Sequence, residues 1–281
     1  MNLALSIARN RGLQKLFSPF LPQTAAFEVI REIQIEIPLQ DQTGPAFYLN
    51  HGGPQAFYHY EEVEKVEILR GLPMSGVFLD IGANIGLFST YVAKLLPKTQ
   101  CFAFEPNPLL AQCLRKTVEK SPFPQIHVQE VCLSDKVGSV DLYLHKRNSG
   151  GHSMIDSSID LVERDLPLSV QSTTLDRWMQ QAPISKVDAI KMDVQGAELL
   201  VLQGAKDTIL KSRPLLLIEI ENENLLKEIN AGSKWMADLF ENFSIRIAGE
   251  NLKFGVVALP EIAKKEIALG HLHSNYVFTP N

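Results

Sequence analysis

The sequence has few cysteines, no surplus of positive charge and no long apolar run. Its three cysteines are scattered along 281 residues, which argues against a disulfide framework or a zinc site. The net charge of −5 offers no basic field to nucleic acid or to anionic lipid, and no apolar stretch is long enough to span a bilayer. We therefore expect a cytoplasmic protein with no nucleic-acid partner and no integral membrane segment.

The composition is typical of a globular protein, with 45% hydrophobic and 21% charged residues. We expect residues 1–72 to form an N-terminal accessory segment. Its apolar first 22 residues make a poor secretory signal, so a first helix packed on the core or on a partner subunit is expected, with a peripheral membrane contact as the alternative. Residues 27–39 alternate like one half-buried strand, residues 43–60 are rich in turn residues, and residues 61–72 show helical spacing.

From Val77 onward, short apolar runs alternate with helical segments. The expected strands cover residues 77–81, 101–104, 126–133, 140–144, 187–194, 215–220 and 275–279, the last as an antiparallel edge strand. The expected helices cover residues 86–96, 108–120, 175–180 and 197–210. This alternation predicts an α/β fold for residues 73–281, with a mostly parallel sheet covered on both faces. Ligands in such folds bind outside the carboxyl ends of the strands.

The segment VFLDIGANIGLFS, residues 77–89, joins a strand to a helix through a turn with an acid and two glycines. Asn84 stands where a dinucleotide fingerprint has its second glycine, and the Gly-Lys-Ser/Thr of a P-loop is missing. Asp80 also disfavours a phosphate, since two like charges about 4 Å apart repel by several kcal/mol. The turn therefore favours a ligand with a positive group and no pyrophosphate, such as S-adenosylmethionine. A tight turn whose glycines serve only close packing remains the alternative.

Two further strand ends carry polar residues that suit a nucleoside. Glu105 ends the second strand, 25 residues after Asp80, and an acid there is placed to accept hydrogen bonds from ribose hydroxyls. A surface glutamate is the alternative. After the third strand, Asp135 could accept a hydrogen bond from an adenine amino group, with Ser134 beside it. A turn opened by Ser-Asp explains this pair equally well.

Six segments in order resemble the FkbM-type family of S-adenosylmethionine-dependent methyltransferases: VFLDIGANIGLFS, AFEPNP, LSDKVGSVDLYLH, TLDRW, IKMDVQGAELLVLQGA and RPLLLIEIE. Together they span residues 77–221. The resemblance implies a class I methyltransferase fold, which is Rossmann-like with an antiparallel last strand, and S-adenosyl-L-methionine as cofactor. It also implies methyl transfer to a hydroxyl of a sugar, a glycan or a polyketide-type metabolite. A homo-oligomer is an open option.

The resemblance further implies positions for the cofactor. The residues expected at the methionine end are Asp80, Gly82, Ala83, Asn84 and Gly86. Those expected around the ribose and the adenine are Glu105, Pro106, Asn107, Ser134 and Asp135. Ser153 and Met154 are expected to contact the cofactor from a loop. Gln195 departs from the family pattern K-I-D-V-E-G-A-E, in which glutamate is commoner at this position, so one charge near the cofactor is lost.

Methyl transfer to a hydroxyl also needs a group that takes a proton. Asp193 ends the fourth strand and is expected to act as this base or to orient the hydroxyl, with a helix-capping acid as the alternative. His152 is a second candidate base because its pKa range suits the role, with a surface-loop histidine as the alternative. Glu219 and Glu221 could join Asp193 in a magnesium site, but we expect no metal to be needed. A non-catalytic nucleoside-binding or assembly protein is the alternative function.

Overall fold

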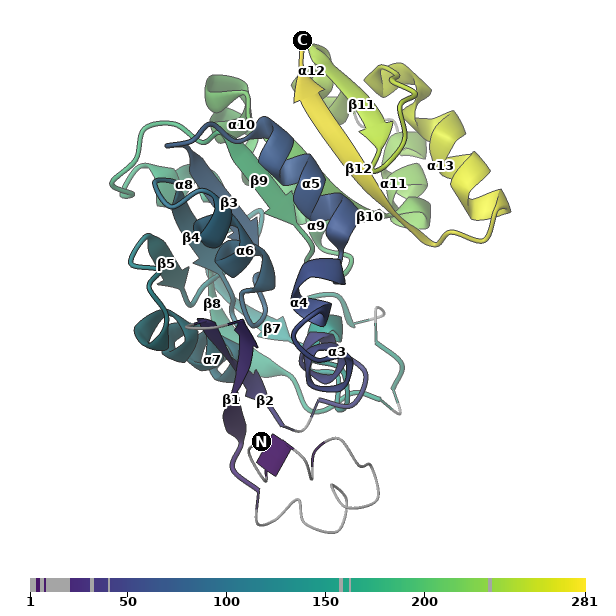
Figure 1. Cartoon of the computed structure of the whole chain (residues 1–281). Helices are drawn as coiled ribbons and strands as arrows, with labels where there is room; N and C mark the ends of the chain where they lie inside the picture. Colours follow the sequence, from purple (N-terminus) through teal and green to yellow (C-terminus); the bar gives the residue numbers. More distant parts are fainter. Residues whose placement is uncertain are drawn as a thin grey trace.

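The computed structural model describes residues 4, 5, 8, 21–30, 33–39, 41–156, 159–161, 163–231 and 234–281. Its centre is a seven-stranded sheet in the order β11-β12-β10-β9-β3-β4-β5 (Figure 1). The strands are β3 Val77–Ile81, β4 Gln100–Phe104, β5 Ile126–Gln129, β9 Ala189–Met192, β10 Leu215–Glu221, β11 Phe243–Ile247 and β12 His273–Pro280. β12 is antiparallel to both neighbours, and the other paired strands are parallel. The predicted fold class is thereby confirmed.

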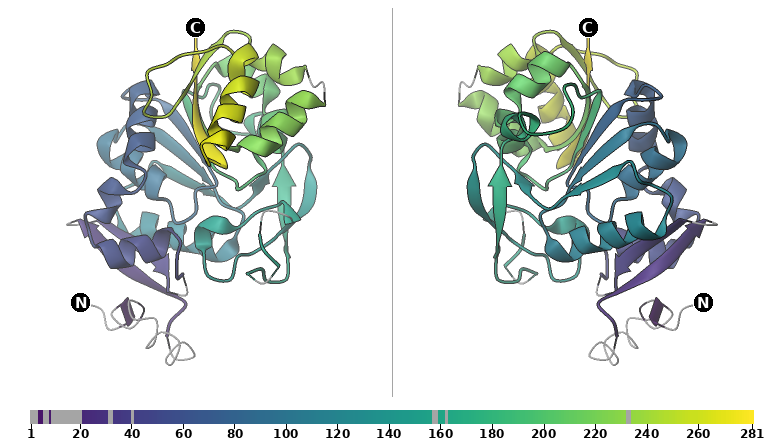
Figure 2. Two further views of the ribbon diagram at one scale, coloured as in Figure 1. Left: turned by 90° about the vertical axis from the view of Figure 1, so that its right-hand side faces the viewer. Right: turned by 90° about the vertical axis from the view of Figure 1, so that its left-hand side faces the viewer.

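Helices cover both faces of this sheet, as the side views show (Figure 2). One face carries α5 Glu62–Gly71, α6 Leu87–Leu95 and α7 Pro108–Lys120. The other carries α8 Leu175–Met179, α9 Glu198–Gln203, α10 Lys206–Ser212, α11 Asn222–Asn230, α12 Trp235–Phe240 and α13 Leu259–Ala268. Successive strand residues point to opposite faces, so Phe78 enters the first apolar core and Leu79 the second. The central strands β3, β4, β9 and β10 are buried along most of their length between these two cores.

The N-terminal region differs from its prediction in two places. The alternating run forms two strands, β1 Thr24–Ile30 and β2 Ile33–Pro38, which pair as an antiparallel hairpin and pack on α7. Residues 43–60 contain two short helices, α3 Pro45–Gly52 and α4 Ala56–His59. The expected first helix falls almost entirely outside the described residues. The boundary at residue 72 remains a proposal about chain organisation, and Ile68 of α5 lies in the same core as Phe78.

Three further predictions about elements were wrong. The strand expected over residues 126–133 splits, and β6 Cys132–Leu133 joins a separate three-stranded sheet with β7 Gly138–Leu142 and β8 Leu168–Thr173. The helix expected over residues 197–210 breaks at Gly204, where the Ser134 carbonyl approaches so closely that a Cβ would lie 2.1 Å from it. β12 is not an edge strand, because β11 pairs along its outer side.

No helix in the part of the chain that the structure describes combines the length and the apolar character needed to cross a bilayer.

Candidate active site

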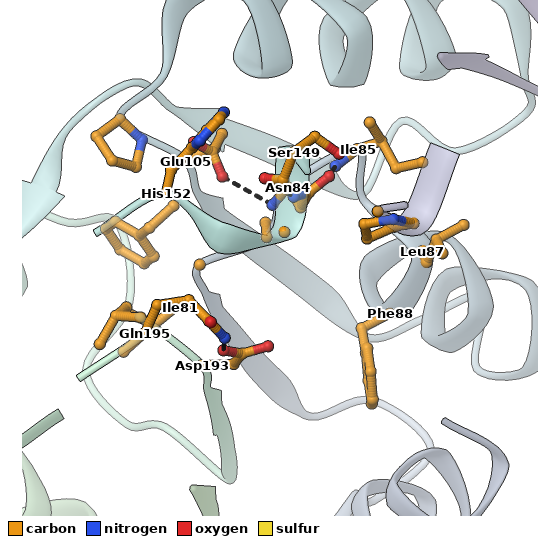
Figure 3. Close-up of a pocket in the computed structure, with 18 of the residues that line it drawn as sticks. Ile81, Asn84, Ile85, Leu87, Phe88, Glu105, Ser149, His152, Asp193 and Gln195 are labelled. Carbon is orange, nitrogen blue, oxygen red and sulfur yellow. Dashed lines mark hydrogen bonds between the residues drawn. The ribbon is translucent and has the colours of Figure 1, made fainter. Parts of the chain in front are cut away.

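A cavity of about 360 Å³ opens at the carboxyl ends of β3, β4 and β9. Its lining comes from the turn after β3, the end of β4, β6, the loop around the short 3-10 helix η2 Ser149–Gly151, the loop after β9, and β10. Residues 43–45, 48, 60 and 61 of the N-terminal region complete it. The cavity therefore lies where parallel α/β sheets bind ligands. We call the side of the cavity that Glu105 lines the Glu105 end, and the side that Asp193 lines the Asp193 end (Figure 3).

The two glycines of the turn after β3 are required by packing. Gly82 has φ +78°, and a Cβ there would lie 1.9 Å from the Asp193 carbonyl oxygen. Gly86 has φ +80°, and a Cβ there would lie 2.1 Å from Leu114. Gly82 lines the cavity, as do Ala83 and Asn84, whereas Gly86 does not. The glycines thus perform the packing role that the sequence left open as an alternative, and Gly82 also places the turn against the β9 backbone.

Asp80 lies beneath the cavity and is not part of its lining. Its side chain is fully buried, and its Oδ2 accepts hydrogen bonds from the Ser89 amide at 3.0 Å and the Ser89 hydroxyl at 2.7 Å. Asp80 lies opposite Lys191 in the register between β3 and β9. Burial raises the pKa of Asp80, and Lys191 opposes that rise. Asp80 thus interacts with Ser89 at the start of α6 and with Lys191, and its side chain does not line the cavity.

The Glu105 end combines one buried carboxylate with an apolar slot. Glu105 is 5% exposed, and its two oxygens accept hydrogen bonds from the Asn84 and Asn107 amides, each at 2.8 Å. Burial raises the pKa of Glu105 to about 7, although these two backbone hydrogen bonds oppose the rise. The neighbouring lining residues are Phe104, Pro106, Val131, Cys132, Leu133, Leu142 and Met154. A flat purine next to a ribose suits this combination.

Asp41 anchors the N-terminal region to this end of the cavity, and sequence reasoning missed it. Its carboxylate caps the start of α3 by accepting from the Gly44 and Ala46 amides. It also accepts from the Ser149 amide at 3.0 Å and the Ser149 hydroxyl at 2.8 Å. The Ser149 carbonyl then accepts from the Asn84 side chain at 2.7 Å (Figure 3). A continuous set of hydrogen bonds therefore runs from Asp41 through Ser149 and Asn84 to Glu105.

The Asp193 end contains a buried cation among carboxyl groups. Alternation along β3, β9 and β10 directs Asp80, Lys191 and Glu219 toward the face covered by α5 and α6. The Lys191 ammonium lies 3.4 Å from the Asp193 carboxylate, whose other oxygen accepts from the Gln195 side chain at 2.6 Å. Burial alone would lower the pKa of Lys191, but the surrounding carboxyl groups, Asp193 first among them, hold it above its usual range.

Two glutamates complete the Asp193 end, and one of them comes from the N-terminal region. Burial and the nearby Asp193 raise the pKa of Glu219 to about 8. Burial raises the pKa of Glu61, and the charge of the nearby Lys191 opposes this rise. The corner that carries Tyr60 and Glu61 is held by Lys65, whose buried ammonium donates to the Phe57 and Tyr60 carbonyls. Neither Tyr60 nor Glu61 stands in a recognisable motif, so the sequence offered no signal for them.

Left-handed backbone conformations gather at the cavity. Among the described residues, four non-glycine residues have positive φ: Glu61, Asn84, Gln195 and Arg213. The first three line the cavity. Such conformations cost free energy and persist where the surrounding structure holds them in place, which is common at functional sites. The departure at Gln195 has a direct consequence, because its amide donates to Asp193 where an ionised glutamate side chain could only repel it.

His152 lines the cavity but is arranged as a donor. Its Nδ1 accepts a hydrogen bond from the His145 amide at 3.0 Å, which leaves the proton of the neutral ring on Nε2. Burial, reinforced by His145, lowers the pKa of His152 to about 4, so the ring is neutral near pH 7. Figure 3 shows His152 at the Glu105 end, away from Asp193. The prediction that His152 assists Asp193 as a base therefore has no geometric support.

The other residues singled out in the sequence lie outside the cavity lining, namely Asn107, Ser134, Asp135, Ser153 and Glu221. Asn107 caps α7, and Ser134 donates to Asp135, which is exposed. Ser153 donates to the Gln195 carbonyl at 2.6 Å and so joins two loops that line the cavity. Within the described ranges, no three His, Cys, Asp or Glu side chains are grouped so that they could hold a metal ion.

Several proteins of known name are similar to this chain. It is 36% identical over 150 residues to 2-O-methyltransferase NoeI of Sinorhizobium fredii, covering 49% of this chain and 60% of that protein. It is 26% identical over 144 residues to the hexuronic acid methyltransferase AglP of Haloferax volcanii, covering 51% of this chain and 55% of that protein. The crystal structure of Methyltransferase FkbM from Methylobacillus flagellatus KT aligns with a TM-score of 0.49 at 15% identity, covering 83% of this chain and 52% of that one.

The chain spans only about 60% of the length of NoeI and 55% of that of AglP. A family model covers more than half of the chain and includes the turn after β3, Glu105 and Asp193. That model is the Methyltransferase FkbM domain, and it matches residues 80–241. The protein accordingly belongs to the FkbM family of S-adenosylmethionine-dependent methyltransferases.

Proposed function

We propose that the protein transfers a methyl group from S-adenosylmethionine to a hydroxyl of a sugar, a glycan or a glycosylated or polyketide metabolite. The observation that carries this proposal is the continuity of the cavity, which joins a buried carboxylate suited to ribose with an aspartate suited to proton transfer. One of the relatives is named a 2-O-methyltransferase, and another is named a hexuronic acid methyltransferase. Their acceptors support a hydroxylated substrate class for this chain.

The residues at the Glu105 end suit the nucleoside part of the cofactor. Glu105 would accept from both ribose hydroxyls while its backbone hydrogen bonds keep it in place, and the slot of Phe104, Cys132 and Met154 would hold the adenine. The Asp193 carboxylate suits the positive charge on the sulfur of the methionine part. When bound there, the cofactor supplies a methyl carbon that is activated by a cationic sulfur.

Asp193 is the group best placed to take the proton that the acceptor hydroxyl must lose. Its carboxyl is 20% exposed, lies on the cavity and is held from two sides by Lys191 and Gln195. Such fixed geometry lets a base align with its proton without reorganisation. Solvent at the cavity mouth can later receive the proton from Asp193. His152 would then act as a neutral hydrogen-bond donor.

The proposal is tested by comparing metabolites and glycans from cells with and without the protein, and by adding the purified protein with S-adenosylmethionine that carries an isotope-labelled methyl group. We expect a labelled methyl group on a hydroxylated product. Binding of S-adenosylhomocysteine without any labelled product would instead favour a non-catalytic nucleoside-binding protein. Binding of NAD in place of both adenosyl ligands would contradict the proposed cofactor site.

Replacing Glu105 with alanine is expected to weaken S-adenosylhomocysteine binding by about 1.5–3 kcal/mol, because two ribose hydroxyls lose a charged acceptor. In the wild type, affinity should rise with pH through about 7, since the carboxylate is the better acceptor and the pKa of Glu105 lies there. Calorimetry at pH 6 and 8 measures both effects. The Glu130→Ala variant, which removes an exposed acid paired with Arg115, is the control. Equal affinities in the Glu105 variant and the wild type would exclude the ribose role.

Replacing Asp41 with asparagine is expected to weaken S-adenosylhomocysteine binding by roughly 1–2 kcal/mol although Asp41 does not line the cavity. The reason is that one side-chain oxygen becomes an amide donor facing the donors of Ser149 and α3, which disturbs the loop that orients Asn84. A merely structural role would lower thermal stability alone. A double variant separates the structural role from the role through Asn84. In protein that already carries Asn84→Ala, adding Asp41→Asn should no longer change the affinity for S-adenosylhomocysteine.

A further inference from the structure

The Asp193 end of the cavity offers many more hydrogen-bond acceptors than donors. Among the described residues, the ionised or ionisable carboxyl groups that line the whole cavity are Glu61, Glu105, Asp193 and Glu219, and the one cationic side chain is Lys191. Of these, all except Glu105 lie at the Asp193 end. Carboxyl groups therefore outnumber cationic groups where the methyl acceptor would bind.

The donors at this end are already engaged with the protein. The Lys191 ammonium lies 3.4 Å from Asp193, and the carboxyl groups of Asp80, Glu61 and Glu219 surround it. The Gln195 amide donates to Asp193 at 2.6 Å. The Lys191 charge is thus already balanced by carboxyl groups of the protein. An anionic group on an incoming methyl acceptor would remain unpaired there, and burying an unpaired charge is strongly unfavourable.

The hydrogen-bond acceptors at this end, in contrast, can accept hydrogen bonds from a ligand. Glu219 lies 3.8 Å from the His273 imidazole Nδ1, and the Lys191 ammonium, which it shares with the other carboxyl groups, is also near it. Glu61 is the N-cap residue of α5 and lines the cavity, where its side chain forms a hydrogen bond with Tyr60. Each carboxylate oxygen offers two acceptor positions. A ligand rich in hydroxyl or amino groups would satisfy them.

Aromatic side chains border the same region and suit the apolar face of a sugar ring. The Tyr48 and Tyr60 rings lie 5.3 Å apart at a tilt of 54°, and both line the cavity. Phe88 also lines the cavity, and the Lys191 ammonium lies 5.1 Å from the centroid of its ring. Carboxylates for hydroxyl groups and rings for the C–H face together fit a polyhydroxylated ring.

We infer that the acceptor is a polyhydroxylated, uncharged or amino-bearing molecule, such as a neutral or amino sugar, and that Glu61 and Glu219 exclude acceptors with a carboxylate or phosphate next to the reacting hydroxyl. This inference rests on the proposed methyl transfer and narrows its substrate class. The raised pKa values of Glu61 and Glu219 agree with it, because crowded carboxyl groups gain most from a neighbouring positive charge and are disturbed most by another negative one.

The test uses three probes that differ mainly in charge: the methyl glycosides of glucose, glucosamine and glucuronic acid, repeated in the galactose series. Binding to the S-adenosylhomocysteine-loaded protein is followed by saturation-transfer NMR. We expect the amino and neutral glycosides to bind, with affinity for the uronide at least 10-fold weaker. In Glu61→Gln and Glu219→Gln, this preference for the amino glycoside over the uronide should shrink by about 10-fold.

Two variants control for the change in charge alone. Glu62→Gln and Glu223→Gln remove neighbouring acids whose side chains are 62% and 54% exposed, and both should keep the wild-type preference. A uronide that binds wild-type protein as tightly as the amino glycoside, or a failure of every glycoside to bind, would overturn the inference. Failure of the proposed function would appear separately, as a protein that does not bind S-adenosylhomocysteine or yields no methylated metabolite.

Discussion

Asp193→Asn is expected to lower kcat by about 10²–10⁴-fold, which is the range that a general base contributes. The amide keeps the size of the side chain but cannot accept the proton that the acceptor hydroxyl must lose. Because S-adenosylhomocysteine has no charged sulfur, its affinity should stay within about threefold of the wild type. The measurement is single-turnover methyl transfer to the acceptor identified from the metabolite comparison, combined with calorimetry of S-adenosylhomocysteine.

Controls for this experiment distinguish a protein base from a metal. Asp238→Asn, at an exposed position of α12, should leave kcat unchanged. Wild-type turnover should survive EDTA if Asp193 takes the proton unaided. Turnover that is lost in EDTA and restored by magnesium, together with a similar loss in Glu219→Gln, would contradict the role of Asp193 and leave the methyl transfer itself intact.

Gly82→Ala is expected to have the largest effect on the folded state, lowering the free energy of unfolding by about 3 kcal/mol or more. A left-handed alanine costs roughly 1–2 kcal/mol, and here its Cβ would also overlap the Asp193 carbonyl, whose backbone must move. The same displacement would shift the turn that lines the cavity. S-adenosylhomocysteine binding should therefore fall by more than about 100-fold. Denaturant unfolding and calorimetry measure these two quantities.

The matched control is Gly270→Ala. Gly270 has φ +87°, close to the +78° of Gly82, but open space surrounds the position where its Cβ would be. This variant should show the conformational cost alone, about 1–2 kcal/mol, with normal ligand binding. A Gly82→Ala protein as stable as Gly270→Ala would show that the contact between the two backbones is not needed.

The pattern of apolar runs and helix breaks in the sequence was enough to predict the elements around the turn after β3. β3, β4 and α7 lie within one residue of their predicted bounds, because apolar runs with clear breaks and the Asn107–Pro108 helix start leave few alternatives. Strand ends then located Glu105 and Asp193, since ligands gather at the carboxyl edge of a parallel sheet. These two residues do line the cavity.

Residues that reach the cavity through long-range contacts could not be predicted in this way. Asp41 contacts Ser149 across 108 positions, and Glu61 meets Lys191 only because α5 packs on the sheet. Nothing in a single sequence states which distant loop a turn-rich segment will meet. The same limit explains the wrong assignment of residues 126–133, where the choice between two sheets depends on β8, a partner strand 35 or more residues further along.

The close contact between Gly82 and the Asp193 carbonyl ties the turn after β3 to the residue proposed as the base, so these two parts can change little without each other. Tyr48, Tyr60 and Glu61, in contrast, come from a stretch that precedes the residues matched by the family model. In evolutionary terms, part of the surface proposed to meet the substrate is encoded outside the segment that the family model matches, while Glu219 lies within that segment. A descendant could acquire a new substrate through changes at Tyr48, Tyr60 and Glu61, and an engineer could exchange these three residues between relatives while keeping Asp41, which supports the Glu105 end.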